Sequence, residues 1–536
     1  MRDKTRKTRR TKSRFGTQLS REEGTIIKDW GGRLPVALIY PNSYYLGMSN
    51  LGIHAIYNLL NGYHEVVCER VFWEKGAQNL SPLSIESQRP LADFAILAFS
   101  VSYELDYFNV VSILKASGTP LYAADRDERH PLIIAGGPCI TANPMPLSPF
   151  FDCLCIGEAE PILPAVLPVL LEGISGRRDE LLKVLASLPG IYVPAYPSRT
   201  PVVRQWAKNL DEFATTSVIL TPDTELGELY LIEVERGCHW GCRFCLVNIA
   251  FAPRRFRSVD KLIEQARQGL RYRRRIGLVG PAAADHPQIK ELLVSLRQMG
   301  AELSISSLRI SSLSRDILSE LSKGKTQTIT VAPEAGSQRL RQVIRKGISD
   351  NDILEAMDRV AEQHIKQLKL YFMLGLPSET DEDAADIVKL TQAIKDNLDR
   401  HQSNTRITLN VAPFVPKAGT PFQWLPMAPL PTLNHRLSLL KRSLPPKGIK
   451  LKTESPAWSQ IQGVFSRGDA RVAEALANIE EVSLSGWRKT VDKCHLDIEY
   501  YVNQRWDTTQ RLPWAMIDSG TKPEHLKSEL EKALPQ

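Results

Sequence analysis

The sequence lacks the features of several protein classes. It has no run of about 18 consecutive apolar residues, the length that a membrane-spanning helix needs. Its first residues lack the apolar centre of a secretory signal, so we expect a cytoplasmic protein. Cysteine accounts for only 8 of the 536 residues, too few for a disulfide scaffold. With 43% hydrophobic residues, the chain is long enough for about two to four packed domains, which excludes disorder and collagen-like repeats.

The chain also lacks a strong charge outside one short segment. Its 68 Lys and Arg residues and 60 Asp and Glu residues give a formal net charge of +8. Residues 1–14 contain eight basic residues and one acidic residue, so the remainder is almost neutral. Such a tail either contacts nucleic acid or stays solvated, and a neutral remainder favours solvation. We expect no membrane partner and do not favour a nucleic-acid partner.

Short apolar runs alternate with helical stretches in the first part of the chain. Strands are expected at 36–40, 65–72, 94–99, 132–135 and 153–156. This alternation predicts a doubly wound parallel sheet of the α/β class. Ligands of such sheets bind beyond the carboxyl ends of the strands. The candidate ligand-binding loops are therefore 47–52, 100–103, 136–141 and 157–160.

A second series of strands and helices follows. Strands are expected at 229–234, 276–279, 303–307, 328–331, 368–373 and 407–411. Six such units predict a partial (β/α)6 barrel of the TIM type, with its chemistry at the carboxyl ends of the strands. The rest of the chain is mostly helical. The expected segments are a basic tail, a Rossmann-like domain, a connector, the barrel and a helical extension, at 1–33, 34–200, 201–226, 227–427 and 428–536.

Three of the eight cysteines lie close together after a predicted strand. Cys238, Cys242 and Cys245 occur in Cys-His-Trp-Gly-Cys-Arg-Phe-Cys. Thiolates suit zinc or iron–sulfur clusters. A structural zinc site usually needs two separated pairs of ligands, and no second pair is evident. Three thiolates on one loop can hold three irons of a 4Fe–4S cluster and leave the fourth iron open. Zinc and an inert group of thiols are the alternatives.

The cysteine motif resembles the signature of radical S-adenosylmethionine (SAM) enzymes. Further motifs resemble that superfamily in the same order along the barrel. They are Gly280-Pro281, Ala332–Arg339, Phe372–Thr380 and Val411–Pro421. Gly280-Pro281 departs from the usual Gly-Gly-Glu, so the resemblance implies a backbone contact there without a carboxylate.

The resemblance implies a mechanism and a set of binding residues. The three cysteines would ligate the cluster, whose open iron takes the amino and carboxylate groups of SAM. Reductive cleavage would give methionine and a 5′-deoxyadenosyl radical, with the electron from a donor such as a flavodoxin or ferredoxin. Arg309 or Lys346 would pair with the carboxylate, and Glu334 would accept hydrogen bonds from the ribose. The expected cofactor-binding residues are Phe244, Gly280, Arg309, Glu334, Lys346, Gly375 and Val411.

The N-terminal half resembles the cobalamin-binding-type domain of many radical SAM proteins. Residues 136–144 and 156–160 carry the resemblance. With residues 40–52 and 512–520, the chain from about Leu34 to Leu534 resembles an uncharacterised subfamily with this arrangement. No Asp-x-His-x-x-Gly loop is present, and Cys139 stands where many relatives have histidine. The domain is therefore either a cobalamin site or a scaffold that has lost the cofactor. The candidate cobalamin contacts are Gly47, Ser49, Ser100, Gly136, Gly137, Gly157 and Glu158.

Several functional alternatives remain open. Cobalamin-dependent methyl transfer competes with hydrogen abstraction that needs no cobalamin, on an unknown substrate. An RNA-associated binding module with a structural cluster, or an RNA-modifying protein similar to methylthiotransferases, is the alternative of a different class. Arg254, Arg255, Arg257 and the run Arg271–Arg275 either bind phosphate or lie on a solvated helix surface, which we favour.

Overall fold

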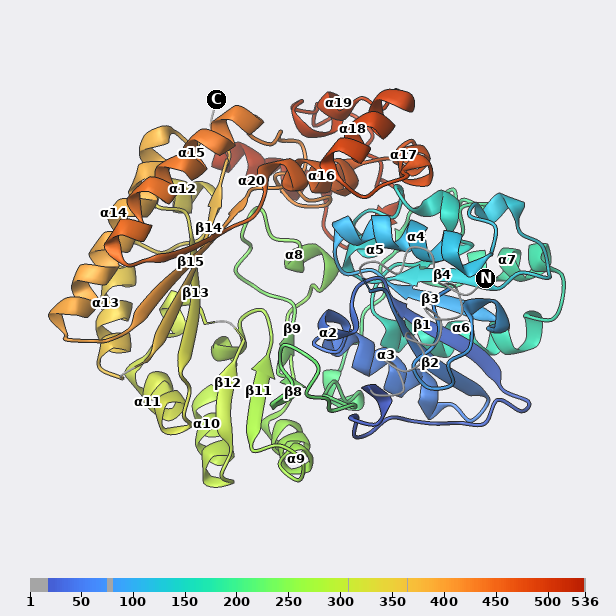
Figure 1. The fold of residues 1–536 in the computed structure, drawn as a ribbon, viewed down its shortest axis with the longest axis horizontal. Helices are drawn as coiled ribbons and strands as arrows, with labels where there is room; N and C mark the ends of the chain where they lie inside the picture. Colours follow the sequence, from blue (N-terminus) through green and yellow to red (C-terminus); the bar gives the residue numbers. More distant parts are fainter. Residues whose placement is uncertain (1–17, 75–80, 307, 364, 535–536) are drawn as a thin grey trace, which may run out of the picture.

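The computed structural model describes residues 18–74, 81–306, 308–363 and 365–534. An N-terminal α/β domain lies beside an open barrel, and C-terminal helices extend over both (Figure 1). Residues 1–14, the basic tail, lie outside the described part. No described helix is long and apolar enough to cross a membrane.

The N-terminal domain is built on the expected parallel sheet. Its strand order is β2-β1-β3-β4-β5-β6, and only β6 is antiparallel. All five predicted strands are confirmed. The strands are β1 (Leu34–Tyr40), β2 (Val66–Phe72), β3 (Ile96–Ser100), β4 (Leu132–Gly136), β5 (Cys153–Cys155) and β6 (Ile191–Tyr192). The helices are α2 (Tyr44–Gly47), α3 (Leu51–Gly62), α4 (Tyr107–Ser117), α5 (Pro138–Ala142), α6 (Ala159–Gly173) and α7 (Arg178–Ala186).

Side-chain alternation along β1 explains why both faces of this sheet are covered. Val36 and Leu38 belong to one hydrophobic cluster, together with residues of α3 and α6. Ala37 and Ile39 belong to a second cluster, together with residues of α4. A parallel strand that is buried on both faces reads as a continuous apolar run, as this one does.

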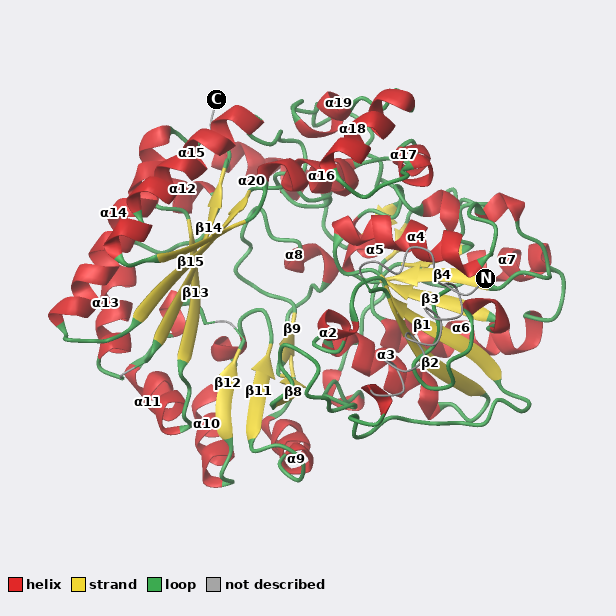
Figure 2. Ribbon diagram, in the orientation of Figure 1, coloured by secondary structure: helices red, strands yellow, loops and turns green. Residues whose placement is uncertain are grey.

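The barrel contains two groups of parallel strands, shown as arrows in Figure 2. Their orders are β12-β11-β8 and β13-β14-β15-β16. The six predicted strands are confirmed as β8 (Leu229–Glu233), β11 (Arg275–Val279), β12 (Glu302–Ile305), β13 (Thr328–Glu334), β14 (Gln367–Leu374) and β15 (Arg406–Pro413). The sequence analysis missed β16 (Lys450–Thr453). The helices are α9 (Val259–Gly269), α10 (Ile289–Gln298), α11 (Arg315–Lys323), α12 (Gln338–Val343), α13 (Asp350–Ala361) and α14 (Asp381–Arg400).

The C-terminal helices tie the two parts together. They are α15 (Leu430–Ser443), α16 (Pro456–Arg467), α17 (Val472–Asn478), α18 (Leu484–Lys493), α19 (Ile498–Val502) and α20 (Pro523–Ala533). Phe108 of α4 lies with its ring centre 5.0 Å from that of Phe465 and 5.7 Å from that of Trp487. The core of the N-terminal domain therefore continues into the C-terminal helices.

Two segments that we expected to be a tail (1–33) and a connector (201–226) make specific contacts with the rest of the chain. In the first, Arg70 binds Glu22 at 2.7 Å, and both side chains are buried. In the second, β7 (Val202–Val203) pairs with β17 (Ile517–Asp518) near the other end of the chain. The partners of both segments lie far away in sequence, where local patterns cannot reveal them.

Candidate active site

The cysteine loop lies between two short elements, β9 (Glu235–Arg236) and α8 (Val247–Ala250). Its first residue is Gly237, with a φ of +81°. A Cβ atom at this position would lie 2.5 Å from the carbonyl oxygen of Phe251. Only glycine permits both this backbone conformation and this close approach. The loop is therefore pinned against the segment that follows it.

The three thiols of the loop lie within electrostatic reach of one another. Burial raises the pKa of Cys238, and the neighbouring Cys242 raises it further. Burial likewise raises the pKa of Cys245 to about 12, with further contributions from Cys242 and Cys238. The neutral thiol is therefore favoured at Cys238 and Cys245 until a cation binds, because a metal stabilises the thiolate.

The donor set fits an iron–sulfur cluster. Among the described residues, no three His, Cys, Asp or Glu side chains converge tightly enough to hold a single ion. A 4Fe–4S cluster does not require that convergence, because each of the three thiolates binds a different iron. Cysteine thiolates are the usual ligands of such clusters.

Residues from distant parts of the chain hold the loop in place. Arg243 pairs with Glu529 of α20 at 3.2 Å, and it also donates to the carbonyl oxygen of Val343 at 2.8 Å. The indole nitrogen of Trp240 donates to Asp285 at 2.6 Å. Phe244 packs against the hydrophobic core that the N-terminal domain shares with the C-terminal helices. Sequence reasoning had given Trp240 no role and had not identified Glu529.

Arg309, Glu334 and Lys346 come together beside the loop, as the sequence analysis expected of SAM-binding residues. The guanidinium of Arg309 stacks 3.8 Å from the ring centre of Trp240 and donates to the carbonyl oxygen of Lys346 at 3.3 Å. Its Nε is buried and has no hydrogen-bond partner among the described residues. Lys346 pairs with Glu334 at 3.2 Å. Arg309 lowers the pKa of Cys238, whereas Glu334 raises that of Cys245. A buried, unsatisfied guanidinium donor beside the thiols suits an anionic group such as a carboxylate.

Two further residues that the resemblance names, Gly280 and Gly375, directly follow barrel strands. Gly280 follows β11 and lies against Glu235, whose carboxylate accepts from the backbone N–H of Ala282 at 2.5 Å. Gly375 follows β14 with a φ of +78°, and its N–H donates to Glu379 at 2.6 Å. Both therefore lie at carboxyl ends of barrel strands.

The side chain of Val411, which the resemblance places among the cofactor-binding residues, does not face the barrel interior. Its side chain is buried in the core that packs the strands against the outer helices. The reason is the two-residue period of a strand, which turns Asn410 and Ala412 to the opposite face. A motif identifies the strand but does not fix which of its side chains points inward.

A cavity of about 620 Å³ extends from the carboxyl ends of the N-terminal strands back between the sheet and the helices α3 and α6. Five of the seven candidate cobalamin contacts line it, namely Ser100, Gly136, Gly137, Gly157 and Glu158. Apolar side chains from α3, α6 and the sheet form most of the wall. The described residues that line the cavity include no histidine.

Gly47 and Ser49 do not line this cavity. Gly47 packs against the ring of Phe72, where an added Cβ would lie 2.3 Å from a ring carbon. The hydroxyl of Ser49 donates to the carbonyl oxygen of Tyr45 at 3.1 Å and bonds to Thr224. The short helix α2 holds the start of this loop away from the cavity.

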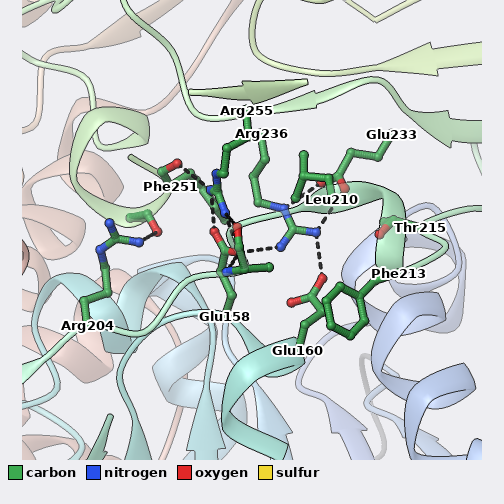
Figure 3. A network of polar contacts seen from close by, with 12 residues as sticks. Glu158, Glu160, Arg204, Leu210, Phe213, Thr215, Glu233, Arg236, Phe251 and Arg255 are labelled. Carbon is green, nitrogen blue, oxygen red and sulfur yellow. Dashed lines mark hydrogen bonds and ion pairs between the residues drawn. The ribbon is translucent and has the colours of Figure 1, made fainter. Parts of the chain in front are cut away.

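Glu158 links the cavity to the cysteine loop (Figure 3). Its carboxylate accepts from Arg236 at 2.8 Å and from Arg255 at 2.7 Å, and Arg236 also binds Glu160 at 2.8 Å. Arg236 directly precedes Gly237 of the loop. Glu158 thus lies on the cavity wall with its carboxylate already paired.

The expectation of solvated arginines was wrong for Arg254, Arg255 and Arg257, whereas Arg271 and Arg274 are exposed as expected. The side chain of Arg257 is fully buried and pairs with Glu233 at 2.8 Å. Arg255 is buried against Glu158, and Arg254 pairs with Glu235 at 2.7 Å. Partners such as Glu158 lie 97 residues away in sequence, so local charge spacing gave no signal of them.

Comparison with known proteins gives matches in both halves of the chain. The family model for radical SAM proteins, N-terminal, matches residues 52–194, and the model for the radical SAM superfamily matches residues 232–391. An uncharacterized protein of Methanocaldococcus jannaschii is 31% identical over 453 residues, covering 82% of this chain and 90% of that protein. An uncharacterized methyltransferase of Pyrococcus horikoshii is 24% identical over 275 residues, covering 49% of this chain and 58% of that protein.

A solved structure resembles the fold over most of the chain. It is TsrM from Kitasatospora setae, a radical S-adenosylmethionine methyltransferase with cobalamin and a 4Fe–4S cluster bound. The TM-score is 0.50 at 13% sequence identity, and the match covers 86% of this chain and 99% of that chain. At this identity the likeness concerns the fold.

Proposed function

Because the chain belongs to the radical SAM superfamily, we propose that it cleaves SAM reductively at a 4Fe–4S cluster held by Cys238, Cys242 and Cys245. Enzymes of this superfamily use a 4Fe–4S cluster and SAM. The observation that carries the proposal is the gathering of the three thiols beside Arg309 and its unsatisfied Nε. When bound, the cluster supplies the electron that breaks the sulfonium bond of SAM and yields a 5′-deoxyadenosyl radical.

The chain's own residues bind and orient SAM in this proposal. Arg309 donates to the carboxylate of the methionine part, since a charge-assisted hydrogen bond there is stronger than a neutral one. Glu334 accepts from ribose hydroxyls at the end of β13, with Lys346 holding it in place. The backbone at Gly280 and Gly375 contacts SAM at the carboxyl ends of β11 and β14.

Other residues keep the loop fixed and water away. Arg243 and Glu529 tether the loop to α20, so the thiols keep their spacing. Phe244 and Met373 pack against one hydrophobic core and shield the reacting atoms from solvent. A flavodoxin or ferredoxin is the proposed electron donor.

The test of SAM cleavage is anaerobic. Protein reconstituted with iron and sulfide is mixed with dithionite and SAM, and 5′-deoxyadenosine is measured by mass spectrometry. Wild type should form it, and Cys242→Ala should not. A wild-type protein that assembles the cluster and gives no 5′-deoxyadenosine with any reductant would contradict the proposal.

We further propose that the cavity of the N-terminal domain binds cobalamin, which makes methyl transfer the favoured reaction type. Its volume suits a drug-sized group, and its mostly apolar walls with polar residues such as Ser100 support enclosure of part of a cobalamin molecule. The likeness in fold to a cobalamin-bound methyltransferase adds to this support.

Cobalamin binding is measured by titrating the purified protein with hydroxocobalamin and following the visible absorbance of the bound fraction. Ala55→Trp on α3 places an indole in the cavity and should weaken binding at least tenfold. Glu172→Trp, at an exposed position of the other wall helix α6 that does not line the cavity, should not. Equal affinity in both variants would exclude the cavity as the cobalamin site. Hydrogen abstraction without cobalamin would then be the favoured reaction.

A further inference from the structure

The inner face of the barrel is open to solvent. Along β13, β14 and β15, the outward residues Val331, Leu370 and Leu409 are buried against helices. The inward side chains alternate with them and are mostly partly exposed. Tyr371 is 43% exposed although it lies on β14, a strand with neighbours on both sides. A barrel of this type usually fills its interior with side chains, so the open face leaves room for a ligand.

Polar side chains form two rows across this open face. In parallel register, Tyr371 of β14 lies beside Asn410 of β15, which lies beside Lys452 of β16. Two residues earlier on the same face, Lys369 lies beside Thr408, which lies beside Lys450. Leu451 packs into the outer core, which confirms that both lysines of β16 are on the inner side. Neighbouring strands are about 4.8 Å apart, so each row fits within the reach of lysine side chains.

The charge of this inner face is unbalanced. Its carboxylates are neutralised: Glu233 binds Arg257, Glu302 binds Lys325 and Glu334 binds Lys346. Its cations Lys369, Arg406, Lys450 and Lys452 form no ion pair with any described residue. The exposed carboxylate nearest in sequence, Glu454, follows β16 and raises the pKa of Tyr103 in the N-terminal domain. The inner face therefore presents net positive charge.

A structural role explains only part of this pattern. Lysines on an edge strand such as β16 prevent pairing with other chains. Lys369 lies on β14 inside the sheet, where that explanation does not apply. An unpaired lysine, an exposed tyrosine and an asparagine side by side are typical of a site for an anion with a planar or polar body.

The two rows lie close to the cysteine loop. Glu334 of β13 lies in register beside Phe372 of β14, between Tyr371 and Met373. Glu334 is also near enough to the loop to raise the pKa of Cys245. Two residues along a strand correspond to about 7 Å. A molecule bound on the rows therefore lies beneath the place where SAM is proposed to bind.

Resting on the proposed function, we infer that the substrate is a small anion, a carboxylate or phosphate ester, bound on the inner face of β14, β15 and β16. Lys369 and Lys452 donate hydrogen bonds to its acidic oxygens. Asn410 donates from its amide, and Tyr371 covers its body. The anion is held at one end so that its other end faces the cleaved SAM.

The experiment uses the reconstituted full-length protein with SAM and dithionite. The probe is a low-molecular-mass filtrate of cell extract, divided on an anion-exchange resin into retained and unretained fractions. The retained fraction should raise the rate of 5′-deoxyadenosine formation. Phosphatase treatment that removes the stimulation identifies a phosphate ester, and stimulation that survives it identifies a carboxylate.

Charge is tested by paired variants. Lys369→Met with Lys452→Met keeps side-chain length without charge and should reduce stimulation about tenfold to a hundredfold, since two charge-assisted hydrogen bonds are lost. Lys369→Arg with Lys452→Arg should restore part of it, which a loss of fold would not allow. Lys441→Met on the outer helix α15 should respond as wild type does.

Two results would overturn the inference while leaving SAM cleavage intact. One is stimulation confined to the unretained fraction. The other is full stimulation of the double methionine variant. Absence of 5′-deoxyadenosine from wild type in every fraction would instead overturn the proposed function, and this inference with it.

Discussion

Arg236 donates a hydrogen bond of 2.8 Å to Glu158, and the residue two positions after Arg236 is Cys238. The bond joins the strand that leads into the cysteine loop to the wall of the N-terminal cavity (Figure 3). Two proposed cofactor sites from different domains are therefore connected through one buried group of ion pairs.

Removing Glu158 should destabilise the protein strongly. Glu158→Ala leaves the buried Arg255 without its carboxylate, and breaking a buried pair costs about 3–5 kcal/mol. Denaturant titration measures the change in free energy of unfolding. Glu228→Ala is the control, because Glu228 is 84% exposed where it pairs with Arg275, and surface pairs contribute about 1 kcal/mol or less. An equal loss of free energy of unfolding in both variants would show that the buried ion pairs of Glu158 stabilise the protein no more than a surface pair does.

A methyl group at Gly237 should prevent cluster assembly. Gly237→Ala places a Cβ atom 2.5 Å from the carbonyl oxygen of Phe251 and forces the loop to move. Iron and sulfide bound per chain after reconstitution should fall well below the wild-type value. Gly300 has a similar φ of +83° but open space around it, so Gly300→Ala tests backbone strain alone and should keep its iron. Full iron content in Gly237→Ala would contradict this account of the loop.

Asp106 should give stability a specific dependence on pH. Burial raises its pKa to about 7, although Asn42 donates to it at 2.7 Å. Between about pH 4 and 7 the folded state therefore keeps a proton that the unfolded state has released, so the contribution of Asp106 to stability falls as pH rises through this window and is constant above it. The slope is at most about 1.4 kcal/mol per pH unit.

Asp106→Asn removes this titration and keeps an oxygen that accepts from Asn42. The difference in free energy of unfolding between wild type and variant should therefore change across the window and be flat above it. Asp125→Asn, at an exposed position, is the matched control and should follow wild type at every pH. A wild-type-minus-variant difference for Asp106 that is the same at pH 4 and pH 8 would refute the assignment.

The strands and the cysteine loop could be predicted because their signals are local. Val36 to Tyr40 is an apolar run of strand length, and Cys238, Cys242 and Cys245 are close in sequence. Glu334 was predicted from the motif after the fourth barrel strand and Lys346 from its position beyond the next helix, whereas Arg309 was named only for its charge. The structure brings these three together beside the loop.

The sequence did not predict which way certain side chains face or which residues far apart in the chain pair with each other. Val411 faces outward because its position in the strand period decides its side. Gly47 and Ser49 are turned from the cavity by α2, a helix of only 4 residues that the sequence pattern did not indicate. Arg243 depends on Glu529, which is 286 residues away, and no local pattern predicts such a pair.

The central claim is that these three cysteines alone hold a cluster with one iron open to SAM. Electron paramagnetic resonance of the reduced, reconstituted protein, recorded with and without SAM, tests it most directly. The account predicts a 4Fe–4S signal whose g values shift when SAM is added, lost in Cys238→Ala, Cys242→Ala and Cys245→Ala and retained in the control Cys494→Ala. A signal that survives removal of any of the three cysteines, or that SAM leaves unchanged, would contradict the claim.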